Sequence, residues 1–334
     1  MSNFTLDDVH ERTYKARDAW WTVLLVDPPA ARLVRFTANR TNITPNQLTV
    51  GALIVGLGAG ASFAMASWPY LLLGALLYHL SFTLDCMDGK IARLKGTGSV
   101  FGAWLDYIFD RIRVLVCAIA LMGGQYAATG NVAYIWAALG VVFLDMLRYM
   151  DALEIYKVRS QMRAQLRRLQ EEAQLLELAR KRANGEDAPV IDPIDRLLSP
   201  DPEADLEDQV VGDQPTPAAI LQQGFNEQFP WYARIRNVLT RTRIRPHLIS
   251  GIEFQMGVFI VAPVVAAVIS GAIIPVSALA GAGMLAFELF IIYKFWLSSR
   301  DYNRTLATLE QQVEELRAGF PGHHQPTLTG ADSV

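Results

Sequence analysis

The sequence predicts an all-α, polytopic membrane protein with six transmembrane helices and an N-terminal amphipathic helix that lies on the membrane surface. Hydrophobic residues make up 51% of the 334 residues and charged residues only 19%, and the apolar residues are concentrated in separate blocks. A helix that crosses a bilayer needs about 20 mostly apolar residues. Six such blocks follow one another along the chain, at residues 47–66, 70–84, 101–124, 132–149, 248–270 and 273–297.

The distribution of Lys and Arg predicts the orientation of these helices. The turns at 67–69, 125–131 and 271–275 contain no Lys or Arg, whereas the N-terminal segment, the 90–100 turn, the 156–245 stretch and the C-terminal tail hold nearly all of them. Basic residues favour the cytoplasmic side of a membrane. We therefore expect a multi-pass protein of a bacterial plasma membrane with both termini in the cytoplasm. The polar N-terminus indicates no cleavable signal sequence.

The segment before the first block is predicted to be amphipathic. Trp20 and Trp21 precede the apolar run 23–26, and Asp27-Pro28-Pro29 interrupts the pattern. Tryptophan beside such a run suits the headgroup zone, so we expect a helix on the inner leaflet. The following Thr44-Pro45 pair is typical of a capped helix start.

Five parts follow from this pattern. Residues 1–45 are the amphipathic segment, 46–155 contain transmembrane helices 1–4, 156–245 are a cytoplasmic insertion, 246–299 contain helices 5 and 6, and 300–334 are a cytoplasmic tail. The insertion opens with a charged helix at 157–182, which has eight basic and three acidic residues. It continues at 184–217 with ten acidic residues and six prolines, a composition typical of a disordered linker. It ends in a basic amphipathic segment.

The most informative motif spans residues 85–110 and reads D-x2-D-G-x2-A-R-x8-G-x3-D-x3-D. Asp85 and Asp88 are three residues apart and Asp106 and Asp110 four apart, so each pair shares one face of a helix. The second apolar block is short and must include the region around Asp85. A carboxylate at such a depth is costly and usually functional.

Two helix faces that carry carboxylates and lie close together form a site for hard divalent cations. A pair of such ions suits the transfer of phosphorus-containing groups. Without cations, Asp85, Asp88 and Asp106 would repel one another strongly, so they are predicted to hold two Mg²⁺ or Mn²⁺ ions. Asp110, one turn further on, is then the predicted general base for an incoming hydroxyl and a further metal ligand.

The other four residues of the motif, two glycines, an alanine and an arginine, are predicted to bind a nucleotide and its phosphates. Gly89 and Ala92 lack bulk, so a nucleotide can lie against the backbone, and Gly102 leaves room for another group to approach. Arg93 supplies a guanidinium fork for phosphate oxygens.

These eight positions resemble, without exception, the signature of the CDP-alcohol phosphotransferases. The resemblance covers residues 40–155 and 245–297. It implies an integral membrane transferase that passes a phosphatidyl or phospho-alcohol group from a CDP-activated donor, such as CDP-diacylglycerol, to a polar alcohol in phospholipid biosynthesis, with release of CMP. It also implies that the first three aspartates bind metal, that the fourth also takes the proton, and that the Gly-Ala-Arg part accommodates CDP.

The acceptor alcohol is less well defined by the sequence. The ending FGAWLDYIFDR resembles inositol-type members of the family, and basic side chains for a phosphorylated polyol are then Arg111, Arg113, Arg148 and His247. Acidic residues near the same helix ends would instead suit an amine; they are Asp145, Asp151, Glu154 and Glu253.

Two other classes of protein are compatible with parts of this pattern. A membrane prenyltransferase also binds a diphosphate through Asp-rich motifs and Mg²⁺, but its two motifs lie in separate halves of the bundle. A non-enzymatic membrane adaptor would explain the insertion but does not need the acidic motif. The expected partners are the CDP-activated donor, a small polar alcohol, membrane lipids and a second copy of the chain in a homodimer, with no nucleic acid.

Overall fold

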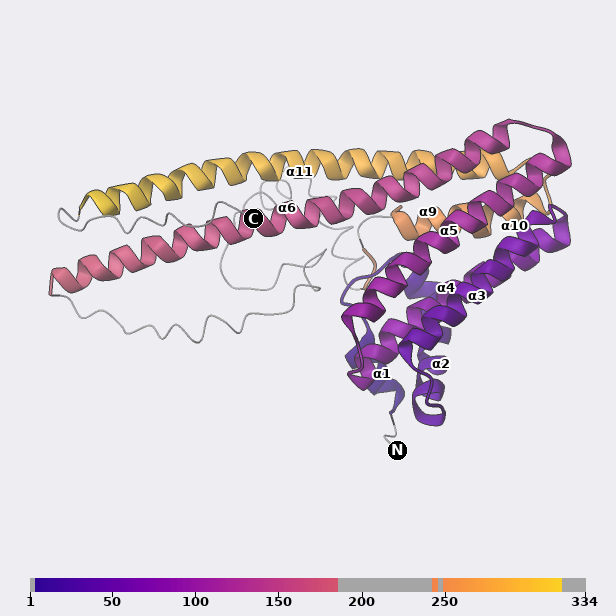
Figure 1. The fold of residues 1–334 in the computed structure, drawn as a ribbon, viewed down its shortest axis with the longest axis horizontal. Helices are drawn as coiled ribbons and strands as arrows, with labels where there is room; N and C mark the ends of the chain where they lie inside the picture. Colours follow the sequence, from indigo (N-terminus) through magenta and orange to yellow (C-terminus); the bar gives the residue numbers. More distant parts are fainter. Residues whose placement is uncertain (1–3, 186–241, 246–248, 320–334) are drawn as a thin grey trace, which may run out of the picture. The chain divides into compact units, whose positions relative to one another are not determined.

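The computed structural model describes residues 4–185, 242–245 and 249–319. Apart from one isolated β-bridge between Asp18 and Ile244, the regular structure in these residues is helical (Figure 1), which confirms the predicted all-α class. The chain divides into two compact units, one formed by residues 1–152 and 226–292 and the other by 153–225 and 293–334. His247 and nearly all of the predicted acidic linker lie outside the described residues.

The first unit contains the N-terminal helices and the apolar helices that carry the motif. Its elements are α1 (Leu6–Thr13), the π-helical turn η1 (Thr22–Val26), α2 (Asp27–Arg40), α3 (Pro45–Ala64), α4 (Trp68–Lys95), α5 (Val100–Thr129), α9 (Gly251–Met256), the π-helical turn η4 (Gly257–Val261), α10 (Ala262–Ala266) and the first parts of α6 (Ala133–Ala183) and α11 (Ile273–Ala318).

Helix α3 packs against both α4 and α5, and two glycines allow these helices to approach closely. A Cβ atom added at Gly74 of α4 would lie 2.5 Å from the ring of Phe63, and one at Gly124 of α5 would lie 2.7 Å from the carbonyl oxygen of Ala64. Small residues at such contacts are typical of helix pairs in membranes. The contacts fix α4 and α5, which carry the four aspartates, against a common neighbour.

Four of these helices are long and apolar enough to cross a membrane: α3, α4, α6 and α11. Large apolar side chains such as Ile54, Leu76 and Leu139 remain exposed on them, as expected of helices that face lipid. Helix α5 is not among the four, and its first half carries four charged residues. The apolar stretch Gly251–Ala266 is shorter. The structure thus supports a membrane protein but supplies four of the six predicted spans.

The motif lies on two helices joined by a short turn. Helix α4 continues without a break to Lys95, so Asp85 and Asp88 lie inside it instead of in a loop. Gly96 ends α4 with a left-handed backbone (φ 63°), a conformation that glycine adopts at no steric cost. Ser99 then caps α5 by accepting a hydrogen bond from the backbone N–H of Gly102.

The structure corrects one part of the prediction for the N-terminal segment. Asp27-Pro28-Pro29 does not interrupt the helix, because the chain passes from η1 directly into α2. The prolines occupy the first turn of α2, where a missing N–H costs little. The predicted start of the next helix is confirmed, since Thr44 and Gln47 form a reciprocal capping box and Pro45 is the first residue of α3.

The second unit contains the later parts of α6 and α11, which lie side by side and run in the same direction (Figure 1). Ala173 of α6 packs with Val313 and Leu316 of α11. The Tyr302 hydroxyl donates to Gln165 Oε1 at 2.8 Å. The predicted charged helix at 157–182 is therefore present, as the direct continuation of α6 and not as a separate helix.

Candidate active site

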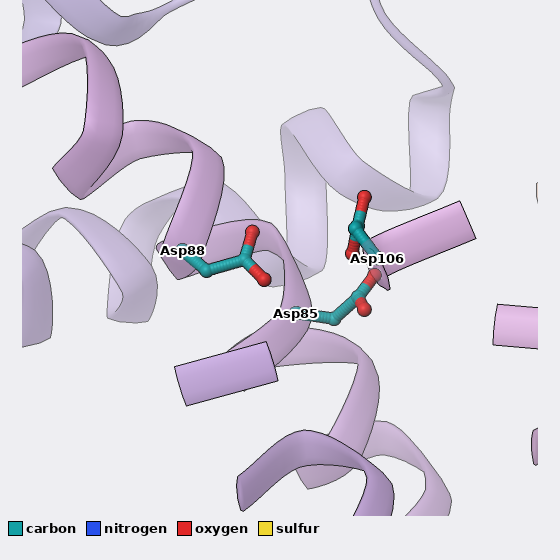
Figure 2. Close-up of side chains that lie close together, drawn as sticks. All are labelled: Asp85, Asp88 and Asp106. Atoms are coloured by element: carbon teal, nitrogen blue, oxygen red, sulfur yellow. The ribbon is translucent and has the colours of Figure 1, made fainter. Parts of the chain in front are cut away.

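Three of the four motif aspartates converge in the structure (Figure 2). Asp85 and Asp88 extend from α4 and Asp106 from α5, and one carboxylate oxygen of each lies within 4.8 Å of the others. Asp88 also accepts a hydrogen bond from the Thr49 hydroxyl of α3. One oxygen of Asp106 is buried without a hydrogen-bond partner. Three carboxylates with an unsatisfied oxygen fit a hard divalent cation.

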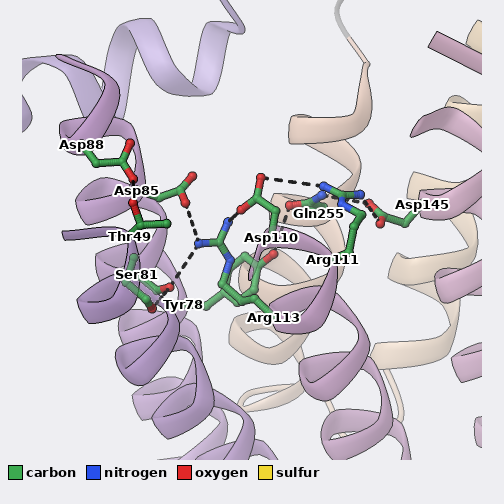
Figure 3. Close-up of polar contacts among 11 residues, drawn as sticks. Thr49, Tyr78, Ser81, Asp85, Asp88, Asp110, Arg111, Arg113, Asp145 and Gln255 are labelled. Carbon is green, nitrogen blue, oxygen red and sulfur yellow. Dashed lines mark hydrogen bonds and ion pairs between the residues drawn. The ribbon is translucent and has the colours of Figure 1, made fainter. Parts of the chain in front are cut away.

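Asp110 has different surroundings, because two guanidinium groups contact its carboxylate (Figure 3). Arg113, one turn later on α5, donates through Nη2 to Asp110 Oδ1. Arg111 Nη2 lies 3.8 Å from Asp110 Oδ2. Asp110 is therefore next to the cluster of three but is held by basic side chains.

Arg113 also reaches α4. Its Nη1 atom lies 3.3 Å from Asp85 Oδ1 and 3.4 Å from Ser81 Oγ. The residue is only 2% exposed, and its guanidinium carbon lies 5.9 Å from the centre of the Tyr78 ring. Arg113 thus bridges two of the four aspartates from within the helix bundle.

Arg111 is fixed by a second set of buried polar groups (Figure 3). Its Nη1 donates to Asp145 Oδ2 of α6, and its guanidinium lies 4.2 Å from the centre of the Tyr149 ring. Gln255 of α9 donates to Asp145 Oδ1 at 2.8 Å and accepts from the Tyr78 hydroxyl at 3.2 Å. This chain of contacts connects α4, α5, α6 and α9 around Asp110.

The residues predicted to receive CDP lie along α4 and at the start of α5. Arg93 is exposed, and its Nε donates to the carbonyl oxygen of Thr13 at the end of α1. Gly89 and Ala92 are half-buried on the same helix. The group that approaches Gly102 is Asn46, whose Oδ1 would lie 2.7 Å from a Cβ atom added there.

The remaining predicted acceptor residue in the described part of the chain is Arg148 of α6. Its Nε lies 3.2 Å from Glu288 Oε1 of α11, and its guanidinium carbon lies 5.3 Å from the centre of the Phe287 ring. Arg111, Arg113 and Arg148 therefore each pair with a carboxylate of the chain itself.

A neighbouring cluster was missed by the sequence prediction. Lys90, two residues after Asp88, is buried and its Nζ lies 3.0 Å from Asp27 Oδ1. Arg243 Nη1 lies 3.4 Å from Asp27 Oδ2, and the Arg243 guanidinium lies 4.2 Å from the centre of the Tyr14 ring. The position of Lys90 inside the motif could have marked it as a candidate for a buried ion pair. Nothing in the sequence identified Asp27 as its partner.

Comparisons with known proteins agree with the geometry. Residues 42–168 match the family described as CDP-alcohol phosphatidyltransferase. The chain is 35% identical over 89 residues to the phosphatidylinositol phosphate synthase of Corynebacterium glutamicum, a match covering 27% of this chain and 37% of that protein. It is 37% identical over 87 residues to the archaetidylinositol phosphate synthase of Pyrococcus horikoshii, covering 26% of this chain and 44% of the relative.

A third relative is the bifunctional IPC transferase and DIPP synthase of Archaeoglobus fulgidus, 35% identical over 116 residues, or 35% of this chain and 22% of that protein. Each of these matches spans less than half the length of the relative. The family match at residues 42–168 contains the four aspartates and ends within the predicted insertion. Most of the insertion and both ends of the chain lie outside this match.

Proposed function

Because residues 42–168 match the family described as CDP-alcohol phosphatidyltransferase, we propose that the chain transfers a phosphatidyl or phospho-alcohol group from a CDP-activated donor, such as CDP-diacylglycerol, to the hydroxyl of a polar alcohol. The proposed reaction releases CMP and belongs to phospholipid biosynthesis. The observation that carries the proposal is the convergence of Asp85, Asp88 and Asp106 inside the matched segment. Asp88 is buried and Asp85 and Asp106 are half-buried. Carboxylates withdrawn from water in an apolar helix bundle are costly and mark functional sites.

The metal ligands of the proposed enzyme are Asp85, Asp88, Asp106 and Asp110, which would hold two Mg²⁺ or Mn²⁺ ions. Their oxygen-only donor set and the unsatisfied buried oxygen of Asp106 fit such ions. Bound divalent ions supply neutralisation of the charge on the pyrophosphate oxygens while CMP departs.

Asp110 is the proposed general base. It removes the proton from the acceptor hydroxyl while that oxygen forms a bond to the phosphorus of the transferred group and the bond from this phosphorus to the CMP oxygen breaks. Before the donor binds, Arg111 and Arg113 contact both oxygens of Asp110 and so hold its carboxylate in a fixed orientation.

The donor is proposed to lie along the exposed side of α4 near Gly89 and Ala92, with phosphate oxygens at Arg93. Arg93 is exposed, its Nε donates to the carbonyl oxygen of Thr13, and its guanidinium group is the proposed partner of the phosphate oxygens. Gly102 is the fourth residue proposed to bind the donor, and its lack of a side chain allows Asn46 to approach closely.

The proposed acceptor is inositol or an inositol phosphate, since the relatives in the matched segment are named for inositol-containing products. Arg111, Arg113, Arg148 and His247 remain the proposed acceptor residues. Arg111 and Arg148 pair with Asp145 and Glu288 in the structure, so a phosphorylated acceptor must exchange with these carboxylates. We further propose six membrane spans, a cytoplasmic active site, a bacterial plasma-membrane location and a homodimer.

A CMP-release assay on the purified protein tests this function. CDP-diacylglycerol is supplied with Mg²⁺, and inositol, inositol phosphate, glycerol phosphate and serine are compared one at a time. We expect release only with an inositol-type acceptor, loss of release with EDTA, and recovery with Mg²⁺ or Mn²⁺. Absence of release with every acceptor would contradict the proposal, and full turnover in metal-free buffer would contradict its metal dependence.

A further inference from the structure

Arg113 occupies the space between two of the proposed metal ligands. Its Nη1 lies 3.3 Å from Asp85 Oδ1, and its Nη2 donates to Asp110 Oδ1 (Figure 3). The side chain is 3% exposed. The cation that Asp85 and Asp110 share in this structure is therefore a guanidinium group belonging to the chain itself.

The surroundings of Arg113 are shaped to receive it. A Cβ atom added at Gly56 of α3 would lie 2.8 Å from Arg113 Cδ and 2.9 Å from Cγ, so the aliphatic stem needs a glycine at this position. Ser81 accepts from the same guanidinium at 3.4 Å. The two terminal nitrogens of Arg113 have acceptors, whereas its buried Nε has no hydrogen-bond partner. A buried guanidinium charge is tolerated only where it is paired. Three helices thus contribute to holding one guanidinium beside two aspartates.

The other two aspartates lie in a different environment. Asp88 accepts a hydrogen bond from a neutral hydroxyl, that of Thr49, and one oxygen of Asp106 is buried without a hydrogen-bond partner. Together with a carboxylate oxygen of Asp85, the carboxylates of Asp88 and Asp106 can bind one cation. The four carboxylates are therefore not equivalent toward metal ions.

We infer that Arg113 is a built-in cation that competes with the second divalent ion, so that the two ions bind with different affinities and in a fixed order. This inference rests on the proposed function. The first ion binds at Asp85, Asp88 and Asp106 without the donor. An ion that uses both Asp85 and Asp110 binds only when Arg113 releases Asp110.

The donor favours this release on electrostatic grounds. A pyrophosphate diester carries two negative charges, which balance those of a divalent ion, so the second ion and the donor enter together without changing the net charge of the site. A second ion alone would place a positive charge against the buried Arg113, which is unfavourable in a region of low dielectric constant. Pyrophosphate oxygens also offer the released guanidinium a new bidentate partner.

Mn²⁺ binding to the intact protein in detergent, without donor or acceptor, tests the inference. Equilibrium dialysis gives the number of tight ions, and the Mn²⁺ electron paramagnetic resonance spectrum distinguishes one isolated ion from two coupled ones. We expect one tight ion in the parent. Arg113→Met removes the competing charge, keeps an unbranched stem and should bind a second ion at least about tenfold more tightly than the parent, equivalent to ~1.4 kcal/mol.

Arg148→Met is the matched control, because Arg148 is also paired with a buried carboxylate but does not contact the four aspartates. It should leave the number of tight ions at one. Gly56→Ala is a second variant for the case in which Arg113→Met does not fold. Its added methyl displaces the arginine stem while keeping the charge, and should change the second-ion affinity in the same direction by a smaller factor.

Two tight ions in the parent without donor would overturn the inference, as would an unchanged second-ion affinity in both Arg113→Met and Gly56→Ala. Because Mn²⁺ binding requires no turnover, the result is separable from the proposed function. A parent that releases no CMP but shows the expected ion counts would contradict the proposed reaction alone. A parent that turns over while Arg113→Met leaves the ion count unchanged would contradict the role of Arg113 alone.

Discussion

Asp88 and Asp110 carry the same carboxylate group but lie in different surroundings. Asp88 is 7% exposed, accepts a hydrogen bond from Thr49 and belongs to the cluster of three. The side chain of Asp110 is 24% exposed and contacts two guanidinium groups. A metal ligand benefits from a rigid, buried position, whereas a general base must be reached by the hydroxyl from which it takes a proton. These differences support separate roles for the two residues.

Asn substitutions at these two positions should therefore have different effects. Asp110→Asn removes the base but keeps the shape of the site, so CMP release should fall by at least ~100-fold while Mn²⁺-dependent binding of CDP-diacylglycerol remains. Asp88→Asn should lose both. Labelled CDP-diacylglycerol binding and CMP release, measured on the same preparations, check this. Equal donor binding and equal metal dependence in the two variants would show that the roles are assigned wrongly.

The close approach of α3 to α5 leaves no room for a side chain at Gly102. In Gly102→Ala the new methyl would lie 2.7 Å from Asn46 Oδ1 and 3.0 Å from Ser99 Oγ, so we expect a lower melting temperature in detergent and slower CMP release. Gly123→Ala, on the same helix with nothing within 4 Å of its added Cβ, is the control and should be neutral or stabilising.

The close contact with Asn46 can be tested directly. Asn46→Ala removes the side chain that the Gly102→Ala methyl would meet, so the double variant should recover most of the lost melting temperature. If Gly102→Ala melts like the parent, or if the Asn46→Ala change restores nothing, the close approach of α3 is not the reason for glycine at this position.

At the scale of the elements, the sequence predicted which residues share a helix face and where a helix begins. It did not predict hydrogen bonds between residues far apart in the chain. The spacing of the motif placed its aspartates correctly on helix faces, and Thr44-Pro45 predicted the start of α3. The link between Asp145 and Gln255 joins residues 110 positions apart. Isolated polar residues of this kind have no periodic signal, because only the tertiary fold brings them together.

The lengths of α6 and α11 show a signal that the prediction did not use. Neither proline nor glycine occurs between residues 141 and 183 or between 284 and 318. A helix without these residues has no reason to end where its composition changes from apolar to charged. The predicted span at 132–149 and the predicted charged helix at 157–182 are therefore parts of one continuous helix, α6.

The cluster around Asp27 provides an element-scale prediction, since it joins α2 to α4 next to the motif. Asp27→Asn would leave Lys90, whose side chain is 5% exposed, without its carboxylate at 3.0 Å. Breaking one partner of a buried ion pair costs about 3–5 kcal/mol. We therefore expect a clearly lower melting temperature in detergent and faster amide hydrogen exchange in α1 and α2.

Two variants distinguish this ion pair from a general sensitivity of the N-terminal helices. The double variant Asp27→Asn with Lys90→Met removes both charges and should recover much of the stability, because no unpaired charge then remains buried. Asp7→Asn, at an exposed position in the first turn of α1, should have a much smaller effect. A double variant that is less stable than Asp27→Asn alone would show that Lys90 has another essential partner.

For the whole molecule, the described turns divide into two classes by charge. The turns after α3, α5 and α10, at residues 65–67, 130–132 and 267–272, contain no charged residue. At the opposite end of the helices the chain carries basic residues. Arg40 precedes α3, and Arg93 and Lys95 lie in the last turn of α4, before α5. Basic residues are retained on the cytoplasmic side during insertion. We therefore expect the proposed site near Asp85 to lie toward the cytoplasm.

Single cysteines read out this orientation in intact cells. Ser67 and Ser270 are exposed in uncharged turns, and Thr129 is exposed at the end of α5. Cysteines at these three positions should react with a membrane-impermeant maleimide added from outside. A cysteine at Gly185, after the charged end of α6, should react only after the cells are opened. The parent carries Cys86 and buried Cys117, so its labelling under the same conditions gives the background. Labelling of Gly185→Cys from outside, with Ser67→Cys protected, would reverse the orientation and place the carboxylate cluster on the side of the membrane away from cytoplasmic nucleotides.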